Sequence, residues 1–396
     1  MLRSLSTLSS RGARNASTVA PAALYETLGK NGIDTYYGVP DSLLKDFCSY
    51  VTDTAPEGSH VIAANEGTAC GLASGYHLGT GKVPVVYMQN SGLGNVLNPV
   101  MSLMHQRVYS IPMLMMVGWR GEPGKKDEPQ HTFMGECMED IMKSMRMQYA
   151  VLPDNIADAE ICIAEAAEYM NREKAPFGLL IQKGVFSKYA LQTDPCPDMY
   201  PLQREEAIKL VASGLPSNAV CISTTGMPSR ELYEHRVEEH GVEGATGRDF
   251  MCVGNMGHSS SIALGLAVAQ PNKDVVCMDG DGSVVMHMGA MVTNGVHGPK
   301  NFKHVVFNNA AHDSVGGQPT FAYDFNIPQI AAASGYKATR TATNAEEIIQ
   351  AVKWMNETEG PVCLEVRIRK GARGDLGRPK SGPIENKEQF MKYAQA

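Results

Sequence analysis

Short apolar runs alternate with stretches of helical periodicity along most of the chain. The runs have the length and composition of buried strands, and they cover residues 83–89, 112–119, 177–183, 218–223, 274–279, 303–308 and 362–368. Between them, the spacing of apolar residues predicts helices over residues 66–78, 155–171, 259–269 and 344–357. In the last of these, Asn344 is the expected N-cap. Strands that alternate with helices predict parallel sheets covered on both faces.

The chain has 396 residues, more than one hydrophobic core usually serves, since single cores stop growing at roughly 250 residues. Pro195, Pro197 and Pro201 interrupt regular structure near the middle. We therefore expect an α/β protein with domains at residues 21–187 and 204–370, joined by a linker at 188–203. A weakly helical tail rich in Gly, Lys and Pro follows at 371–396. The rhythm is similar in both halves, which is compatible with one fold used twice.

The first 20 residues differ from the rest of the chain. They are rich in serine, carry Arg3, Arg11 and Arg14, and precede the first acidic residue, Glu26. This pattern is typical of a mitochondrial transit peptide, so residues 1–20 predict a location in the mitochondrial matrix. The alternative is a slightly basic tail on a cytoplasmic protein. No run approaches the roughly 18 apolar residues of a membrane span, so we expect a soluble protein.

Net charge and cysteine content limit the kinds of partner and the cellular compartment that we expect. The net charge is -7 and the chain has no long basic run, which argues against a nucleic-acid partner. The nine cysteines include no CxxC pair, and several lie in apolar runs. We therefore expect free thiols in a reducing compartment.

Two of the predicted strands end in polar residues. The run at 274–279 leads into Gly280-Asp281-Gly282, and the run at 303–308 leads into Asn309. Ligands of parallel α/β sheets bind beyond the carboxyl ends of the strands, so a carboxylate and a carboxamide are expected at one place. Such oxygen ligands suit Mg²⁺, which commonly completes its shell with water and phosphate oxygens.

The residues around Asp281 suit an anion as well. Gly280 and Gly282 let the backbone approach it, and Ser283 opens a helix whose free N–H groups point at it. Together these features predict a magnesium–diphosphate clamp. The alternative is that the glycines and the Asn pair only form turns. The joint occurrence of the two motifs at strand ends, 309 − 281 = 28 positions apart, favours the clamp.

This motif pair resembles the signature of thiamine diphosphate enzymes, and the order of the motifs is similar to that of the decarboxylase branch. The resemblance implies a pyrimidine domain and a diphosphate domain, with no middle domain in a chain of this length. It also implies that Asp281 and Asn309 bind Mg²⁺ with the carbonyl group of Ala311. Met256 would hold the cofactor bent, and Gly226 would contact its aminopyrimidine. His312 and Asp313, directly after the Asn pair, would lie near the diphosphate or the substrate.

The same resemblance requires an acid in the first half that protonates N1′ of the cofactor. Glu66 begins a predicted helix whose other residues are almost all small or apolar, and burial there would raise the pKa of its carboxyl group. We assign Glu66 this role. The alternative is a first-turn glutamate that complements the helix dipole.

Three longer motifs narrow the resemblance. The stretches "GVPDSLLKDF", "RGEPGKKDEPQHT" and "GPKNFKHVVFNNAAHDSVGGQPT" resemble the phosphonopyruvate decarboxylases, which release CO₂ from 3-phosphonopyruvate to give phosphonoacetaldehyde in phosphonate biosynthesis. The likeness runs from about residue 24 to about residue 370. The sulfopyruvate decarboxylases are the nearest related group, with the two halves usually on separate subunits. One departure is Ala310, where glycine is more common, which puts only the turn angle in question.

The resemblance also suggests residues for the later chemistry. Asp41 and His131 are similar to active-site residues of pyruvate decarboxylase and could move protons after CO₂ has left. The alternatives are a turn residue after Pro40 and a histidine on a surface loop. Residues with a positive charge or a hydroxyl group are candidates for contacts to the phosphonate. They are Ser42, Arg120, Lys125 and Lys126, with His105 and Arg107 less favoured. Loop cations are more often simply solvated.

Other functions share most of these features. A protein that keeps the clamp but has lost turnover would not need Glu66, so that alternative is disfavoured. A carboligase, which joins the acyl group to an aldehyde, shares the early steps and stays open, as does decarboxylation of sulfopyruvate or another 2-oxo acid. The resemblance further implies a homodimer or larger assembly, because the pyrimidine half of one subunit meets the diphosphate half of another.

Overall fold

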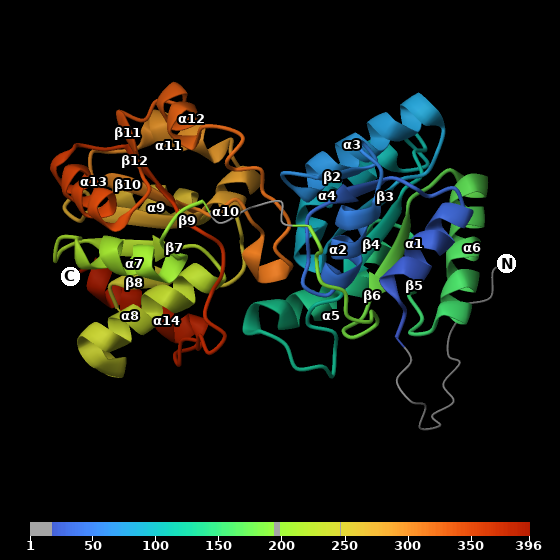
Figure 1. Cartoon of the computed structure of the whole chain (residues 1–396), viewed down its shortest axis with the longest axis horizontal. Helices are drawn as coiled ribbons and strands as arrows, with labels where there is room; N and C mark the ends of the chain where they lie inside the picture. The colour runs from blue at the N-terminus through green and yellow to red at the C-terminus, as the bar shows by residue number, and fades with distance from the viewer. Residues whose placement is uncertain (1–17, 194–198, 246) are drawn as a thin grey trace.

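The computed structural model describes residues 18–193, 199–245 and 247–396. Two six-stranded sheets with exclusively parallel pairing form two units that lie side by side (Figure 1). The predicted α/β class and its two parallel sheets are therefore confirmed. Residues 1–17, which hold most of the predicted transit peptide, lie outside the described residues.

The first unit holds six strands with the spatial order β2-β1-β3-β4-β6-β5. These strands are β1 (Tyr36–Gly38), β2 (His60–Ile62), β3 (Val85–Gln89), β4 (Leu114–Gly118), β5 (Gln148–Val151) and β6 (Phe177–Ile181). The helices of this unit are α1 (Pro21–Lys30), α2 (Lys45–Thr54), α3 (Glu66–Thr80), η1 (Asn90–Gly92), α4 (Leu93–Pro99), η2 (Val100–Met104), α5 (Pro129–Ser144) and α6 (Ile156–Glu173).

The second unit holds the other six strands, with the spatial order β11-β12-β10-β9-β7-β8. These strands are β7 (Val220–Ser223), β8 (Asp249–Met251), β9 (Val275–Gly280), β10 (Phe302–Asn308), β11 (Ala338–Ala342) and β12 (Val362–Arg367). Its helices are α7 (Arg204–Ser213), α8 (Met227–Gly244), α9 (Ser259–Ala269), α10 (Asp281–Met286), α11 (Ala290–His297), η3 (Asp313–Val315), α12 (Ile327–Ala333), α13 (Ala345–Glu357) and α14 (Pro383–Ala394).

The two sheets share one strand order. Read from its other edge, the second sheet is β8-β7-β9-β10-β12-β11, and subtracting six from each number gives the order of the first sheet. The similar rhythm of the two halves therefore corresponds to one fold used twice. Within the second copy, the expected N-cap of α13 is also present, because the Asn344 side chain accepts a hydrogen bond from the Glu347 N–H at 3.0 Å.

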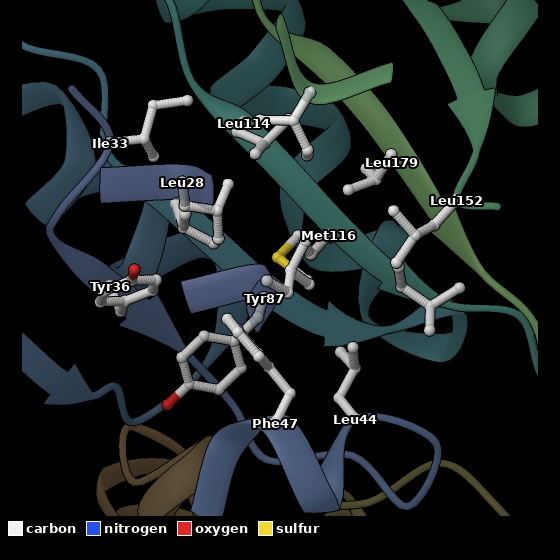
Figure 2. Packing of buried hydrophobic residues seen from close by; sticks show 14 of the residues in the cluster. Leu28, Ile33, Tyr36, Leu44, Phe47, Tyr87, Leu114, Met116, Leu152 and Leu179 are labelled. Atoms are coloured by element: carbon white, nitrogen blue, oxygen red, sulfur yellow. The ribbon is translucent and has the colours of Figure 1, made fainter. Parts of the chain in front are cut away.

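Both sheets are buried on both faces, which is why their central strands are continuous apolar runs. One apolar cluster packs α1, α2 and α6 onto a face of the first sheet, and Figure 2 shows Phe47 and Tyr87 of this cluster among its leucines. A second cluster covers the opposite face, and the second sheet is covered by two further clusters. In the part of the chain that the structure describes, no helix combines the length and apolar character needed to cross a membrane.

Both ends of the described chain pack onto the units and shift two predicted boundaries. Val19 is fully buried, and its N–H donates to the carbonyl of Val185 at 2.8 Å. Cleavage after residue 20 would therefore remove part of the first core, so a processing site would have to precede Val19. At the other end α14 is not a free tail, because the side chain of Asn386 accepts from the Met251 N–H beside β8 and Phe390 joins the core.

Candidate active site

A cavity of about 1110 Å³ lies between the two units and is lined by residues of both. The topology explains its place. In each sheet the chain passes from one strand to neighbours on opposite sides, β1 to β2 and β3, and β7 to β8 and β9. At such a switch point the following helices cover opposite faces and leave a crevice at the carboxyl ends of the strands.

The cavity brings together most of the residues predicted from the sequence. Its wall contains Ser42, Glu66, Arg120, His131, Gly226, Met256, Gly280, Asp281, Gly282, Ser283, Asn309, Ala311, His312 and Asp313. Asp41 is fully buried directly behind this wall, between its lining neighbours Pro40 and Ser42. Lys125 and Lys126 do not line the cavity.

Asp281 is a buried carboxylate with no cation in direct contact among the described residues. It begins α10 and is 4% exposed. The hydroxyl group of Thr320 donates to it, and burial raises the pKa of its carboxyl group to about 6. No Lys, Arg or His of the described residues pairs with it within 4.0 Å. A buried charge of this kind is stabilised by a bound cation, so the site fits Mg²⁺.

Asn309 lies at the end of the neighbouring strand, since β9 and β10 are paired. Its side-chain oxygen accepts from the Ala311 N–H at 3.1 Å, and Ala310 between them has a φ of 54°. This left-handed conformation is the one for which glycine is favoured, so the departure noted at Ala310 does fall on a strained turn. The turn brings Asn309 and Ala311 to the same side of the cavity as Asp281.

Ser283 connects the three loops that carry the predicted cofactor contacts. Its hydroxyl group accepts from the Gly257 N–H at 3.0 Å, beside Met256, and from the Thr224 hydroxyl at 3.2 Å, close to Gly226. Sequence reasoning assigned Ser283 only a helix N–H group and did not identify Thr224 or Gly257. No sequence pattern signals such contacts, because they join residues more than 25 positions apart.

Two glycines, Gly226 and Gly282, line the cavity where the cofactor contacts are predicted. Gly226 has a φ of 96° and a ψ of −137°, and a Cβ atom built there would meet nothing within 4 Å. The methyl carbon of Met256 lies 3.3 Å from the position of a Cβ atom at Gly282. A side chain at residue 226 would therefore have space but would need a positive φ, whereas a side chain at residue 282 would crowd Met256.

Glu66 is 4% exposed at the start of α3. Its Oε2 atom accepts from the Asn95 side chain at 2.7 Å, and a Cβ atom at residue 92 would overlap its carboxyl group, so Gly92 makes room for it. The helix terminus is capped by Asn65, which accepts from the Thr68 N–H at 2.9 Å. Since another residue caps the helix, the geometry favours a buried acid facing the cavity over a helix-dipole partner.

Asp41 is held rigidly after β1. Its carboxylate accepts from the Gln89 side chain at 2.7 Å and from the Leu43 N–H at 2.9 Å. Burial raises the pKa of the carboxyl group, and the hydrogen bond from Gln89 opposes that shift. The contact to Leu43 is the turn interaction that the sequence offered as an alternative, so Asp41 both forms the turn and lies beside the cavity.

His131 is buried and His312 is half-buried. His131 is 9% exposed and lies in α5, so the alternative of a surface loop histidine is wrong. Burial lowers the pKa of His131 and lowers that of His312 to about 4. At neutral pH His312 is therefore uncharged, and it adds no positive charge to the cavity.

The predicted cations for the phosphonate lie mostly outside the cavity. Lys125, Lys126 and Arg107 are exposed, His105 is half-buried, and none of the four lines the cavity. Arg120 lines the cavity, but two of its nitrogens bind Asp127 and a third donates to the Ser42 hydroxyl at 2.8 Å. The Arg120–Asp127 pair closes the intervening loop on itself, which turns Lys125 and Lys126 toward solvent.

One cavity within a single chain holds elements of both predicted half-sites. Glu66 of the first unit and Asp281 of the second line the same space, and the Asn65 side chain donates to the Met286 carbonyl across the two units at 3.0 Å. The two units of one chain are therefore in contact at this cavity.

Two family models match the chain in the segments that build the cavity. The N-terminal thiamine pyrophosphate-binding domain of thiamine pyrophosphate enzymes matches residues 19–144, and the C-terminal thiamine pyrophosphate-binding domain matches residues 242–366. The chain belongs to the thiamine pyrophosphate enzyme family. Thiamine pyrophosphate is thiamine diphosphate, so the predicted pair of cofactor-binding domains without a middle domain is confirmed for this member of the family.

Three curated relatives are similar over nearly the whole chain. The phosphonopyruvate decarboxylase of Streptomyces viridochromogenes is 33% identical over 389 residues, covering 95% of each chain. That of Streptomyces hygroscopicus is 34% identical over 384 residues, covering 92% of this chain and 91% of the relative. The sulfopyruvate decarboxylase of Methanosarcina acetivorans is 26% identical over 393 residues, covering 92% and 95%. The resemblance to phosphonopyruvate decarboxylases is therefore confirmed.

Proposed function

We propose that this chain is a thiamine diphosphate- and Mg²⁺-dependent carboxy-lyase that converts 3-phosphonopyruvate and a proton to phosphonoacetaldehyde and CO₂. The observation that carries the proposal is the single cavity in which buried Glu66 and buried Asp281 both lie. The identity of 33% and 34% to two phosphonopyruvate decarboxylases over more than 90% of the chain supports the choice of substrate.

Each part of the cavity has a role in this proposal. Asp281 and Asn309, with the carbonyl group of Ala311, would hold Mg²⁺ and through it the diphosphate, while Gly280, Gly282 and Ser283 offer N–H groups. When bound, thiamine diphosphate supplies a carbon that adds to the keto group and takes up the electrons left by CO₂. Glu66 would keep a proton at N1′ of the pyrimidine ring.

Protons must also reach the carbon that loses CO₂. His131 lines the cavity on the wall formed by the first unit, and Asp41 is buried directly behind that wall. Burial raises the pKa of Asp41, which favours a carboxyl group that can donate a proton, and lowers the pKa of His131, which favours a neutral imidazole that can accept one. The two units together would exclude water from this step.

The second candidate is decarboxylation of sulfopyruvate, because a sulfopyruvate decarboxylase matches over the full length. A sulfonate carries one charge fewer than a fully ionised phosphonate, and pyruvate carries neither group. A site built around the phosphonate leaves cations unpaired when pyruvate binds. We expect kcat/KM for phosphonopyruvate to exceed that for pyruvate by at least about 100-fold, with sulfopyruvate between them.

A panel of 2-oxo acids tests this order. The protein would be incubated with Mg²⁺, thiamine diphosphate and each acid, and CO₂ and aldehyde would be followed. Equal or greater kcat/KM for pyruvate or sulfopyruvate would refute the choice of substrate while leaving the choice of cofactor intact. Formation of a longer hydroxyketone instead of free aldehyde would indicate a carboligase.

We also propose that the protein is a homodimer or a larger homo-oligomer. Exposed apolar side chains lie on α3, namely Leu72 and Leu78, and on the neighbouring helices α9 and α11, namely Val268, Val292 and Val296. Apolar surfaces of this kind mark contacts between subunits. Light scattering should give a molar mass at least twice that of one chain. The double variant Val292→Lys/Val296→Lys should have a lower molar mass than wild type. Ile161→Lys on α6 is the matched control, and an active monomer at working concentration would refute the proposal.

A further inference from the structure

A dianionic phosphonate in a water-poor cavity needs a cation whose charge is not already neutralised. The cations that line the cavity can be sorted by their partners. Arg120 is bound by Asp127, and Arg204 is bound by Glu231 at 2.8 and 3.0 Å and lies 3.6 Å from Asp313. These two guanidinium groups are therefore compensated.

Arg378 binds Glu128, and Arg230 lies 3.9 Å from the same carboxylate, so these two guanidinium groups share one acid. Of the cavity-lining Lys and Arg residues in the described part of the chain, those with no acid within 4.0 Å are Lys45, Lys183 and Lys188. Sequence reasoning named none of them.

These three lysines are brought together by the packing of one segment on α2. Lys45 is the first residue of α2. The segment after β6 lies along this helix, because Phe186 stacks on Phe47 with ring centroids 5.7 Å apart. The Tyr189 N–H also donates to Asp46 at 3.0 Å. Lys183 and Lys188, on either side of Phe186, therefore lie on the same wall as Lys45.

Lys45 differs from the other two lysines in its burial. It is half-buried, whereas Lys183 and Lys188 are exposed. It also lies on the turn that begins with Asp41 and Ser42, four residues after the acid to which we assign proton transfer. Asp46, the nearest carboxylate in sequence, is buried and directed to Tyr189. Lys45 is thus a half-buried cation on the cavity wall that also contains Ser42.

We propose that Lys45 binds the phosphonate group of the substrate, with Lys183 and Lys188 forming a basic rim that attracts it. This inference rests on the proposed function and names the residue that sets its specificity. The phosphonate then lies against the start of α2, and the keto acid end points toward Glu66 and Asp281. The rim also explains how a chain with a net charge of -7 admits an anion, since a locally basic mouth focuses the field.

The test compares Lys45→Gln with wild type in the presence of Mg²⁺ and thiamine diphosphate. Loss of a charge-assisted contact should lower the ratio of kcat/KM for phosphonopyruvate to that for pyruvate by about 10- to 100-fold. Lys45→Arg keeps the charge and should recover part of the ratio. Lys30→Gln, an exposed lysine at the end of α1, is the matched control and should leave the ratio unchanged.

Calorimetry gives a readout that does not depend on turnover. The non-reactive probe 3-phosphonopropionate should bind Lys45→Gln about 10- to 100-fold more weakly than wild type, while Lys30→Gln binds it as wild type does. The role of Lys45 would be overturned if Lys45→Gln lowered kcat/KM equally for phosphonopyruvate and pyruvate. It would also be overturned if the variant bound the probe as tightly as wild type does. If wild type fails to decarboxylate phosphonopyruvate, the proposed function fails, and the calorimetry still decides whether Lys45 holds an anion.

Discussion

Asp281→Asn is expected to abolish Mg²⁺-dependent binding of thiamine diphosphate and, with it, all decarboxylation. The carboxylate is the only charged side chain among the three proposed metal ligands, and an amide cannot supply that charge. Changes even in groups that only support a metal ligand cost 10- to 100-fold in affinity, so we expect a loss of at least about 100-fold here. Asn309→Ala should have the same direction of effect. Calorimetric titration of cofactor into protein with Mg²⁺ measures both.

Stability separates a lost ligand from a damaged fold. Because the buried carboxylate of Asp281 has no cationic partner in the described chain, its neutralisation breaks no ion pair. The cofactor-free variant should therefore unfold at or above the wild-type temperature, as followed by circular dichroism. Asp274→Asn, just before the opposite end of β9, is the matched control and should bind normally. Undiminished cofactor affinity in Asp281→Asn would remove the metal assignment.

Glu66→Gln should leave cofactor affinity within a few-fold of wild type but slow hydrogen exchange at C2 of thiamine diphosphate by about 10²- to 10⁴-fold. Glutamine has the size of glutamate and can still accept from Asn95, which holds the present carboxylate at 2.7 Å. It cannot donate a titratable proton to N1′. Turnover of phosphonopyruvate should fall in parallel with exchange, as expected when an interaction of the transition state is lost.

Quenched-flow exchange into deuterium oxide, read by NMR, measures the rate at C2. Glu57→Gln, an exposed glutamate of the same unit, provides the control and should exchange at the wild-type rate. Exchange in Glu66→Gln that matched the control would return Glu66 to a helix-dipole role, even if Asp281 proved to hold the metal.

The apolar pattern predicted the inner strands of both sheets and missed the outer ones. The predicted runs correspond to β3, β4, β6, β7, β9, β10 and β12, most of which have neighbours on both sides and lie in the core. The edge strands β2, β5, β8 and β11 were not predicted, and neither was the three-residue β1. An edge strand of a covered sheet is short and partly exposed, as the half-exposed residues of β2 and β5 illustrate, so its sequence lacks a continuous apolar run.

Residues at strand ends were placed correctly because their position follows from chain direction alone. Asp281 and Asn309 meet at the cavity because β9 and β10 are parallel neighbours, and parallel strands present their carboxyl ends at one edge. Loop residues did not follow this logic. Lys125 and Lys126 were predicted at the substrate, but the pairing of Arg120 with Asp127 turns them outward.

By itself, the sequence determined the fold class and the positions of Asp281 and Asn309 at strand ends and of Glu66 at a helix start, because alternating apolar runs and strand-end motifs are local properties of the chain. The tertiary structure alone decided that one chain brings both halves to one cavity and that Ser283 connects three loops. It also decided which cations remain free for an anion. That last property depends on which carboxylates pair with Arg120, Arg204 and Arg378. The pairs of Arg204 with Asp313 and of Arg378 with Glu128 join residues far apart in the sequence, so residue spacing gives no signal of them.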